Sequence, residues 1–274
     1  MTDPAPMQMD WDTGDSHLCP DFRDKGDCHQ CPAEGEPPRN EHGYIKAELP
    51  RLRVAYAKDD RLAFLSHLEV AATIERAVRR ARLPFSVGNG FARRVRMQFS
   101  QSLPTGASSA AEYYDVRLTW RMDPKEALAA LVAATPAALA PFAAGYADGH
   151  APALEAWLDR GLWRVELLGS DVAADALSAA LSDLRAQGSL LYLRQGKEKR
   201  VDLARTLVGF EVAPGADGPV LTLDERADTR AALRPRPLVE CALSSAGLPL
   251  PDALRVRRLA QWHEGPGGTR VEAL

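Results

Sequence analysis

Apolar and polar residues alternate along several stretches of this chain, and in other stretches apolar residues recur at the spacing of an amphipathic helix. Residues 51–57 alternate as a strand does. A helix is predicted from Ser66 to about Arg82, and Ser66 with Glu69 has the spacing of a capping box. Pro84 ends that helix. Its predicted apolar stripe consists of Leu68, Ala71, Ala72, Ile74, Ala77, Val78 and Ala81.

The pattern of strands and helices then occurs twice along the chain. After the first helix we predict strands at 85–87, 95–100 and 112–120, a helix at 123–134 and a strand at 140–146. The second series comprises a strand at 162–168, a helix from a cap at Asp171 to 186, strands at 189–194, 200–203 and 219–223, a helix at 237–245 and a strand at 254–261. Two β-α-β-β-α-β series predict an α+β fold of tandem ferredoxin-like units. The expected divisions are an irregular acidic tail at 1–50 and two halves at 51–150 and 151–274.

The composition indicates a globular protein and leads to an expected cellular compartment. The chain has 274 residues, of which 46% are hydrophobic and 26% charged, as in globular proteins with a core. It has neither an apolar run that could span a membrane nor an apolar signal core near its N-terminus, so we expect a cytoplasmic protein without a membrane partner. Residues 1–50 carry a net charge of −7 within a total of −3, so the remainder carries +4. A mildly basic body is compatible with a polyanionic partner.

Three of the four cysteines, Cys19, Cys28 and Cys31, lie within thirteen residues. Two thiolates spaced as Cys-x-x-Cys can coordinate one metal ion. Because cytoplasmic thiols stay reduced, the sequence of this segment predicts a metal site. Zinc would need a fourth ligand such as His17, His29 or His42, whereas an iron–sulfur cluster usually takes four thiolates. The alternative is a plain tail with free thiols. Cys241 lies in an apolar run and is predicted to be a core thiol.

Arginines concentrate between residues 76 and 96, where seven occur without an acidic residue. Guanidinium groups bind phosphates in a bidentate manner. Within this stretch, Gly88-Asn89-Gly90 allows positive φ angles and close approach of a ligand, and Phe91, with Tyr113 or Tyr114, could stack on bases. The predicted RNA- or phosphate-binding residues are Arg76, Arg79, Arg80, Gly88, Gly90, Phe91, Arg93, Arg94 and Arg96. The alternative is a solvated helix face.

Two further residues are candidates for catalysis. His67 follows the predicted helix cap and could be a general base or an RNA contact, or a helix-terminal histidine bonded to backbone. Asp115 and Glu112 could serve chemistry or could pair with the arginines. The stretch contains no complete nucleophile–base pair and no phosphate loop, so an enzyme is the less favoured reading.

Several motifs between residues 62 and 118 resemble one known family. The motifs are Phe64-Leu65-Ser66-His67-Leu68, Glu75-Arg76-Ala77-x-Arg79-Arg80-Ala81-x-Leu83-Pro84, Gly90-Phe91, Leu103-Pro104-x-Gly106 and Glu112-Tyr113-x-Asp115. They resemble the radical SAM-linked (radical SAM-associated) proteins, a domain of unknown function found alone or fused behind radical SAM proteins. Members continue the glycine turn as Gly-Phe-Asn-Pro-His-Pro, whereas here Ala92-Arg93-Arg94-Val95 follows, so a role for that histidine does not carry over. Fused members carry a short cysteine cluster before the domain, and here its last cysteine is absent.

The resemblance implies a radical SAM protein as a partner. This chain has no Cys-x-x-x-Cys-x-x-Cys motif and cannot perform radical SAM chemistry itself. We therefore expect an accessory protein that binds RNA, such as tRNA or rRNA, through its arginine-rich surface. Two alternatives stay open. One is an RNA-modifying or RNA-processing enzyme with His67, the arginines and Asp115 around one cleft. The other is a protein-docking domain.

Overall fold

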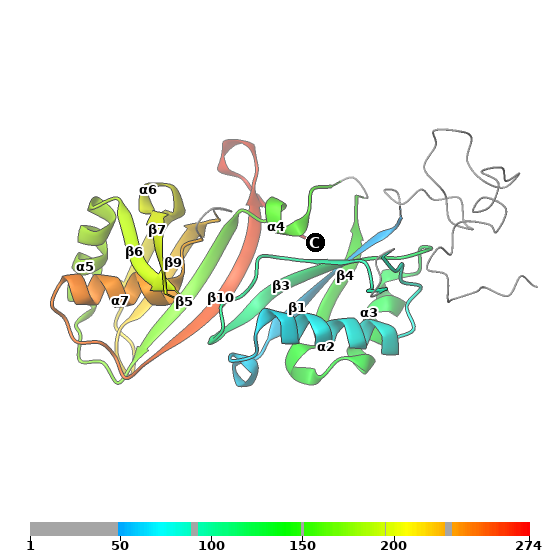
Figure 1. Ribbon diagram of the computed structural model, residues 1–274, viewed down its shortest axis with the longest axis horizontal. Coiled ribbons are helices and arrows are strands. Elements are labelled where there is room, and N and C mark those ends of the chain that lie inside the picture. Colours follow the sequence, from blue (N-terminus) through cyan, green and yellow to red (C-terminus); the bar gives the residue numbers. More distant parts are fainter. Residues whose placement is uncertain (1–48, 89–92, 149–150, 195, 228–231) are drawn as a thin grey trace, which may run out of the picture.

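The computed structural model describes residues 49–88, 93–148, 151–194, 196–227 and 232–274. The cysteine-containing tail lies outside these ranges, as do Gly90 and Phe91, so the predictions that concern them stay predictions. The described residues form strands and helices in a mixed α+β arrangement, which confirms the expected fold class (Figure 1).

The N-terminal elements form a first unit with the strand order of a ferredoxin-like fold. Strand β1 lies between β4 and β3, and the short β2 pairs with β3 on its other side, with every pairing antiparallel. This is the order 4-1-3-2 of a β-α-β-β-α-β unit. The elements are β1 (Arg51–Lys58), η2 (Asp60–Leu62), α2 (His67–Arg80), β2 (Met97–Phe99), β3 (Ala107–Arg117), α3 (Pro124–Ala134), η3 (Ala137–Leu139) and β4 (Pro141–Ala147).

The following elements form a second unit with the same strand order, β10-β5-β9-β8. A hairpin of β6 and β7 and the short helix α6 are inserted between α5 and β8, and this hairpin pairs only with itself among the described strands. The elements are β5 (Arg160–Leu168), α5 (Ala174–Ala186), β6 (Ser189–Arg194), β7 (Lys197–Asp202), α6 (Leu203–Thr206), β8 (Leu207–Ala213), β9 (Val220–Arg226), α7 (Pro235–Ser245) and β10 (Ala253–Glu264).

The two units share one continuous sheet because β3 pairs with β10 in a parallel register that includes Ala107 and Val256 (Figure 1). Helices α2 and α3 cover one face of the first unit, where Ile74 and Leu131 pack against Val54 and Tyr114. Helices α5 and α7 cover the second unit. The main apolar core is therefore the layer between these helices and the sheet.

The opposite face of the first unit is covered only in part. The short helix α4 (Leu154–Trp157) and the C-terminal Ala273 pack there against Ala55 and Tyr113. Figure 1 shows the C-terminus beside α4. Before it, β11 (Arg270–Val271) pairs with the end of β10.

Several local predictions were wrong. Leu68 is 76% exposed because the buried stripe of α2 runs through Val70, Ile74, Ala77 and Val78 instead. Asp171 does not cap α5, which begins after Ala173 without a side-chain cap. Strand β8 was missed, and it pairs with β9 at the end of the main sheet. No helix within the described ranges is long and apolar enough to cross a membrane.

Candidate functional site

Helix α2 begins as its sequence predicts and presents its C-terminal half to the arginine-rich segment. The Ser66 hydroxyl accepts a hydrogen bond from the Glu69 backbone N–H, and the Glu69 carboxylate accepts one from the Ser66 backbone N–H, which completes the capping box. Val70, Ile74, Ala77 and Val78 point into the core. The face left to solvent in the last turns therefore carries Arg76, Arg79 and Arg80.

Two polar contacts hold the chain that follows the glycine turn against this helix. Glu75 Oε1 accepts a hydrogen bond from the Val95 backbone N–H at 3.2 Å, and Arg79 Nη2 donates to the Arg93 carbonyl at 3.1 Å. Arg79 also pairs with Glu75 at 3.0 Å and lies 5.4 Å from the centre of the Phe85 ring. These contacts hold residues 93–95 against the C-terminal half of α2.

The charges around Glu75 set its ionisation. Partial burial by itself would raise the pKa of Glu75, but hydrogen bonds from Arg79 and Val95, with the charges of Arg79 and Arg94, outweigh it and lower the pKa. Glu75 therefore stays ionised and attracts the neighbouring side chains of Arg79 and Arg94. It lies one residue before the acid-free stretch counted in the sequence, and it neutralises part of that stretch.

The predicted phosphate-binding residues divide into two groups. Arg80 donates two hydrogen bonds to the Ala134 carbonyl at the end of α3, and Arg79 is engaged as above, so both have structural roles. Arg76 is exposed and donates a hydrogen bond to Thr73 within α2, and Arg94 is also exposed. Gly88 donates its backbone N–H to the Arg94 carbonyl. Gly88 does not have a positive φ angle, and among the described residues of this segment the positive φ lies at Arg93, at 42°.

Arg96 is separated from the helical arginines by the sheet. Gln98 pairs with Asp115, and Arg51 with Arg117, in the ladders that join β2 and β1 to β3. Cross-strand partners point to the same face of a sheet, and Asp115 shares its face with Tyr113, away from α2. On this face a groove of about 360 Å³ is lined by Arg51, Arg96, Met97, Gln98, Asp115 and Arg117.

Asp115 forms a buried ion-pair network with two arginines of β1. Its carboxylate accepts hydrogen bonds from Arg51 Nε at 2.5 Å, from Arg53 Nε at 2.8 Å and from Arg53 Nη2 at 3.2 Å. The side chains of all three residues are at most 5% exposed. The Arg53 guanidinium also lies 5.3 Å from the Trp157 ring centre and donates to the Ala273 carbonyl. Through Arg51 and Arg53, Asp115 therefore helps to hold α4 and the C-terminus against the sheet.

His67 lies on the helix-covered face and is not brought together with Asp115. Its ring meets the Phe99 ring edge-on at 5.4 Å. It lines a pocket of about 10 Å³ with Tyr56, Lys58 and Glu112, about the space of one water molecule. The Lys58 amino group donates to the carbonyls of Ala63 and Leu65, and burial lowers its pKa although Glu112 opposes this. A single cleft containing His67, the arginines and Asp115 is therefore absent from the described residues.

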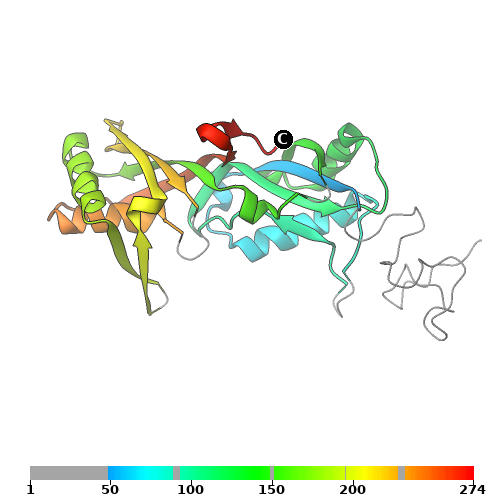
Figure 2. The same cartoon turned by 90° about the horizontal axis from the view of Figure 1, so that it is seen from above.

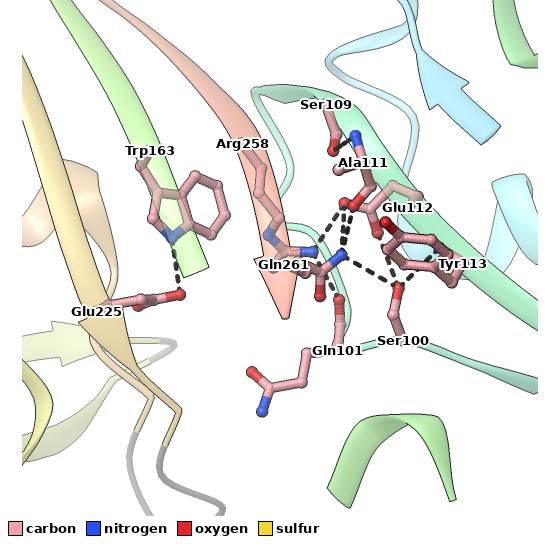
Figure 3. A network of polar contacts seen from close by, with 10 residues as sticks. All are labelled: Ser100, Gln101, Ser109, Ala111, Glu112, Tyr113, Trp163, Glu225, Arg258 and Gln261. Carbon is pink, nitrogen blue, oxygen red and sulfur yellow. Dashed lines mark hydrogen bonds and ion pairs between the residues drawn. The ribbon is translucent and has the colours of Figure 1, made fainter. Parts of the chain in front are cut away.

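A second buried polar network lies where the two units meet (Figure 3). Arg258 Nη1 donates to Glu112 Oε1 at 2.8 Å, and Gln261 Nε2 donates to the Ala111 carbonyl at 2.6 Å. The Arg258 guanidinium lies 4.4 Å from the Trp163 ring centre. The sequence reasoning missed this network, because Arg258 lies 146 positions from Glu112.

Glu225 belongs to the same region and receives a hydrogen bond from Trp163 Nε1 at 2.7 Å (Figure 3). Burial raises the pKa of Glu225 to about 7, even though Arg258 and the Trp163 N–H favour the carboxylate. These contacts surround the place where β10 pairs with β3 on one side and with β5 on the other. We therefore infer that they hold the two units rigidly together and do not serve catalysis.

A further basic element projects from the second unit. The β6–β7 hairpin carries Arg194 and Lys197 as one cross-strand pair and Tyr192 and Lys199 as the next, which places the four side chains on one face. The three cationic side chains are exposed. In Figure 2 this hairpin protrudes toward the lower edge of the view.

The metal prediction remains untested by the described residues. No group of three or more metal-ligating side chains occurs within them, and Cys19, Cys28 and Cys31 lie outside. Cys241 is half-buried near the Leu191 carbonyl, and burial raises the pKa of its thiol, as expected for a core thiol.

The described residues thus define an α+β protein with two ferredoxin-like units on one sheet and a basic edge. Residues 51–235 match the family described as "Uncharacterized protein conserved in bacteria (DUF2344)", and the chain belongs to that family. No curated protein matches the chain. The sequence motifs resembled a family of unknown function, and the match to this uncharacterized family confirms that part of the resemblance. Nothing in these comparisons links the family to radical SAM proteins.

Solved structures with a similar chain path are distant. An archaeal box H/ACA sRNP Nop10–Cbf5 complex has 13% identity and a TM-score of 0.39, with 77% of this chain and 47% of that chain covered. A Cbf5–Nop10–Gar1 complex has 11% identity and a TM-score of 0.42, with 84% and 55% covered. The present chain thus spans about half the length of these two. An unknown protein from Galdieria sulphuraria has 16% identity and a TM-score of 0.24, with 77% and 99% covered. Likenesses this distant transfer no function.

Proposed function

We propose that this protein is a non-catalytic RNA-binding accessory protein. Its binding surface comprises the exposed arginines of α2 and of the segment that follows the glycine turn. The observation that carries the proposal is the pair of contacts from Glu75 and Arg79 to residues 93–95, which hold Arg76 and Arg94 on one surface. Preordered guanidinium groups bind phosphates without the entropic cost of first ordering the segment.

The β6–β7 hairpin supplies a second basic surface. Lys197 and Lys199 are exposed on one face of a two-stranded ribbon, with Tyr192 beside them. The hairpin forms a separate two-stranded sheet, and it is inserted between α5 and β8 of the unit that shares its main sheet with the first unit. We infer that an RNA long enough to reach both basic surfaces is bound more tightly than one that reaches either alone.

The test measures binding of fluorescently labelled bulk tRNA by anisotropy across a series of salt concentrations. Each lost phosphate contact lowers the steepness of log K against log salt by roughly 0.7–0.9. The Arg76→Glu/Arg94→Glu protein should bind at least about tenfold more weakly and show a shallower slope. Lys197→Glu/Lys199→Glu should weaken binding independently.

The matched control is Arg61→Glu/Arg236→Glu, which changes the net charge equally at two exposed arginines away from both basic surfaces. It should bind RNA nearly as the unchanged protein does. Equal losses in the control and the test proteins would show that only net charge matters. Unchanged affinity of the Arg76→Glu/Arg94→Glu protein for tRNA would refute the proposal.

The accessory role rests on the resemblance to radical SAM-linked proteins. It predicts that the tagged protein co-purifies with a radical SAM protein from its native cells. It also predicts that the purified protein alone leaves RNA chemically unchanged, as measured by mass spectrometry of nucleosides and strand lengths. The separation of His67 from Asp115 on opposite faces of the sheet supports binding over catalysis by those two residues. An altered nucleoside or a cleaved strand would favour the enzyme.

A further inference from the structure

The negative charge of the N-terminal 48 residues is concentrated in one short segment. Residues 3–21 contain five aspartates and neither lysine nor arginine, so their net charge is −5. Residues 22–48 contain six acidic and four basic residues, so their net charge is −2. We call residues 3–21 the acidic segment. It lies outside the described residues, and its aspartates are Asp3, Asp10, Asp12, Asp15 and Asp21.

The C-terminal half of α2 and the chain held against it carry the opposite charge. Arg76, Arg79, Arg80 and Arg94 contribute four positive charges, and Glu75 contributes one negative charge, so their net charge is +3. All four arginines are exposed. We call these five residues the arginine surface.

Neutral acceptors orient two of these arginines without cancelling their charge. Arg76 donates to the Thr73 hydroxyl at 3.1 Å, and Arg80 donates to the Ala134 carbonyl at 2.7 Å. The remaining positive charges repel one another, and an anionic ligand bound among them reduces this repulsion. The arginine surface therefore favours an anionic occupant.

The described chain begins close to the arginine surface. The carbonyls of Pro50 and Pro84 accept hydrogen bonds from the backbone N–H groups of Leu118 and Thr119, which are consecutive residues. Neighbouring strands lie about 5 Å apart, so the two prolines, on either side of residues 118–119, are separated by about 10 Å. Pro84 follows the last residue of α2 by four positions. The chain that precedes residue 49 thus joins the first unit next to the end of α2.

The connection between the acidic segment and this point is long enough for a contact within one molecule. Residues 22–48 can span at most about 90 Å, several times the separation between the two prolines. A tethered ligand meets its site at an effective concentration on the order of a millimolar. Each exposed ion pair contributes little by itself, so tethering and several aspartates acting together are both needed.

We propose that the acidic segment binds the arginine surface and competes with RNA for it, an inference that rests on the proposed function for the competing ligand. Carboxylates can replace phosphates there because guanidinium groups bind both. The β6–β7 hairpin is also basic, but it belongs to the second unit, whereas the acidic segment is connected to the first unit next to α2. A surface that is occupied for about two-thirds of the time binds RNA about threefold more weakly than an open one.

The experiment uses the full-length protein with four aspartates of the acidic segment neutralised, Asp10→Asn/Asp12→Asn/Asp15→Asn/Asp21→Asn, which we call the segment variant. All cysteines stay in place, so the predicted metal ligands are unchanged. The control variant removes the same charge from four exposed aspartates of the second unit, Asp171→Asn/Asp175→Asn/Asp183→Asn/Asp217→Asn. Affinity for labelled bulk tRNA is measured by anisotropy at about 0.1 M and about 0.5 M salt, because screening differs between them. Circular dichroism and thermal unfolding check that each protein is folded.

The segment variant should bind tRNA about threefold more tightly than the unchanged protein at the lower salt concentration. The gain should shrink at the higher salt concentration, and the control variant should show a smaller gain. When Arg76→Glu/Arg94→Glu is already present, the four substitutions in the acidic segment should bring no gain, because its site is lost. When Lys197→Glu/Lys199→Glu is present instead, the gain should persist, because the hairpin is not the site.

A synthetic peptide of residues 3–21, labelled and kept reduced, gives a second measurement that does not involve RNA. The peptide should bind the segment variant, and adding Arg76→Glu/Arg94→Glu should abolish this binding. The same peptide with the four asparagines should not bind. These results support the contact even if the protein fails to bind tRNA, so the two proposals can fail separately.

An equal gain in the segment variant and the control variant overturns the proposal, because net charge alone then explains it. A gain that persists together with Arg76→Glu/Arg94→Glu also overturns it, because the acidic segment then acts elsewhere. The absence of both a gain and peptide binding overturns it as well. If Arg76→Glu/Arg94→Glu still weakens tRNA binding in that case, the RNA surface stands without the acidic segment.

Discussion

Replacing Asp115 by asparagine keeps the shape of the side chain but removes the charge shared by Arg51 and Arg53. The carboxylate accepts three hydrogen bonds from these arginines, whose side chains are 1% and 5% exposed. Breaking a buried ion pair by removing one partner costs about 3–5 kcal/mol, because the remaining charge is left buried. Here two guanidinium groups are left, so we expect a loss near 4 kcal/mol.

Urea unfolding followed by tryptophan fluorescence measures this loss. With a slope of about 2–3 kcal/mol per molar urea, the midpoint should fall by roughly 1–2 M. Asp224→Asn is the matched control. It removes a carboxylate from Arg160, but Asp224 is 30% exposed and Arg160 keeps Glu264 as a partner. Its cost should stay within about 1 kcal/mol.

The double variant Asp115→Asn/Arg53→Gln removes one of the two stranded charges. Its loss should be smaller than the sum of the two single losses, because residues in one network are coupled. A midpoint for Asp115→Asn within about 0.3 M of the unchanged protein would refute the structural role of this carboxylate. The result also bears on catalysis, because an inactive Asp115 variant reveals chemistry only if it is folded.

Three further outcomes are expected. Because burial raises the folded-state pKa of Glu225 from 4.5 to about 7, its stabilisation is complete below pH 4.5 and is lost as pH rises toward 7. Unfolding at pH 5 and 8 should thus show a decline, about 3 kcal/mol at most, that Glu225→Gln abolishes; an unchanged decline contradicts the shift. Ser66→Ala should cost about 1 kcal/mol in thermal unfolding by removing the α2 cap, and no loss would mean that the cap is not stabilising. Metal analysis of the full-length protein should find zinc or iron that Cys28→Ser loses, and a metal-free protein would leave that segment a plain tail.

Local signals predicted the local structure well. The capping box at Ser66 and Glu69 and the proline at the start of α3 are encoded within a few residues, and both are present. The apolar stripe of α2 was placed with the wrong phase only at its start, where Leu68 was included. That residue lies in the first turn, off the line through Val70 and Ile74, and it is exposed.

Contacts between distant residues were beyond the sequence reasoning. Asp115 was considered either for catalysis or for pairing with the arginines between residues 76 and 96. Its partners Arg51 and Arg53 lie more than sixty positions earlier and become neighbours only when β1 pairs with β3. The strands predicted at 189–194 and 200–203 are present as β6 and β7, but they pair with each other instead of joining the main sheet. Periodicity identifies a strand, but its partner is chosen by packing across the whole unit.

The number of arginines in a sequence segment therefore overstates its binding capacity. Arg79 and Arg80 hold loop and helix backbone, and Glu75 offsets part of their charge. Conversely, Arg117 was not counted at all, yet it lines a groove together with Arg96, on the face of the sheet opposite α2.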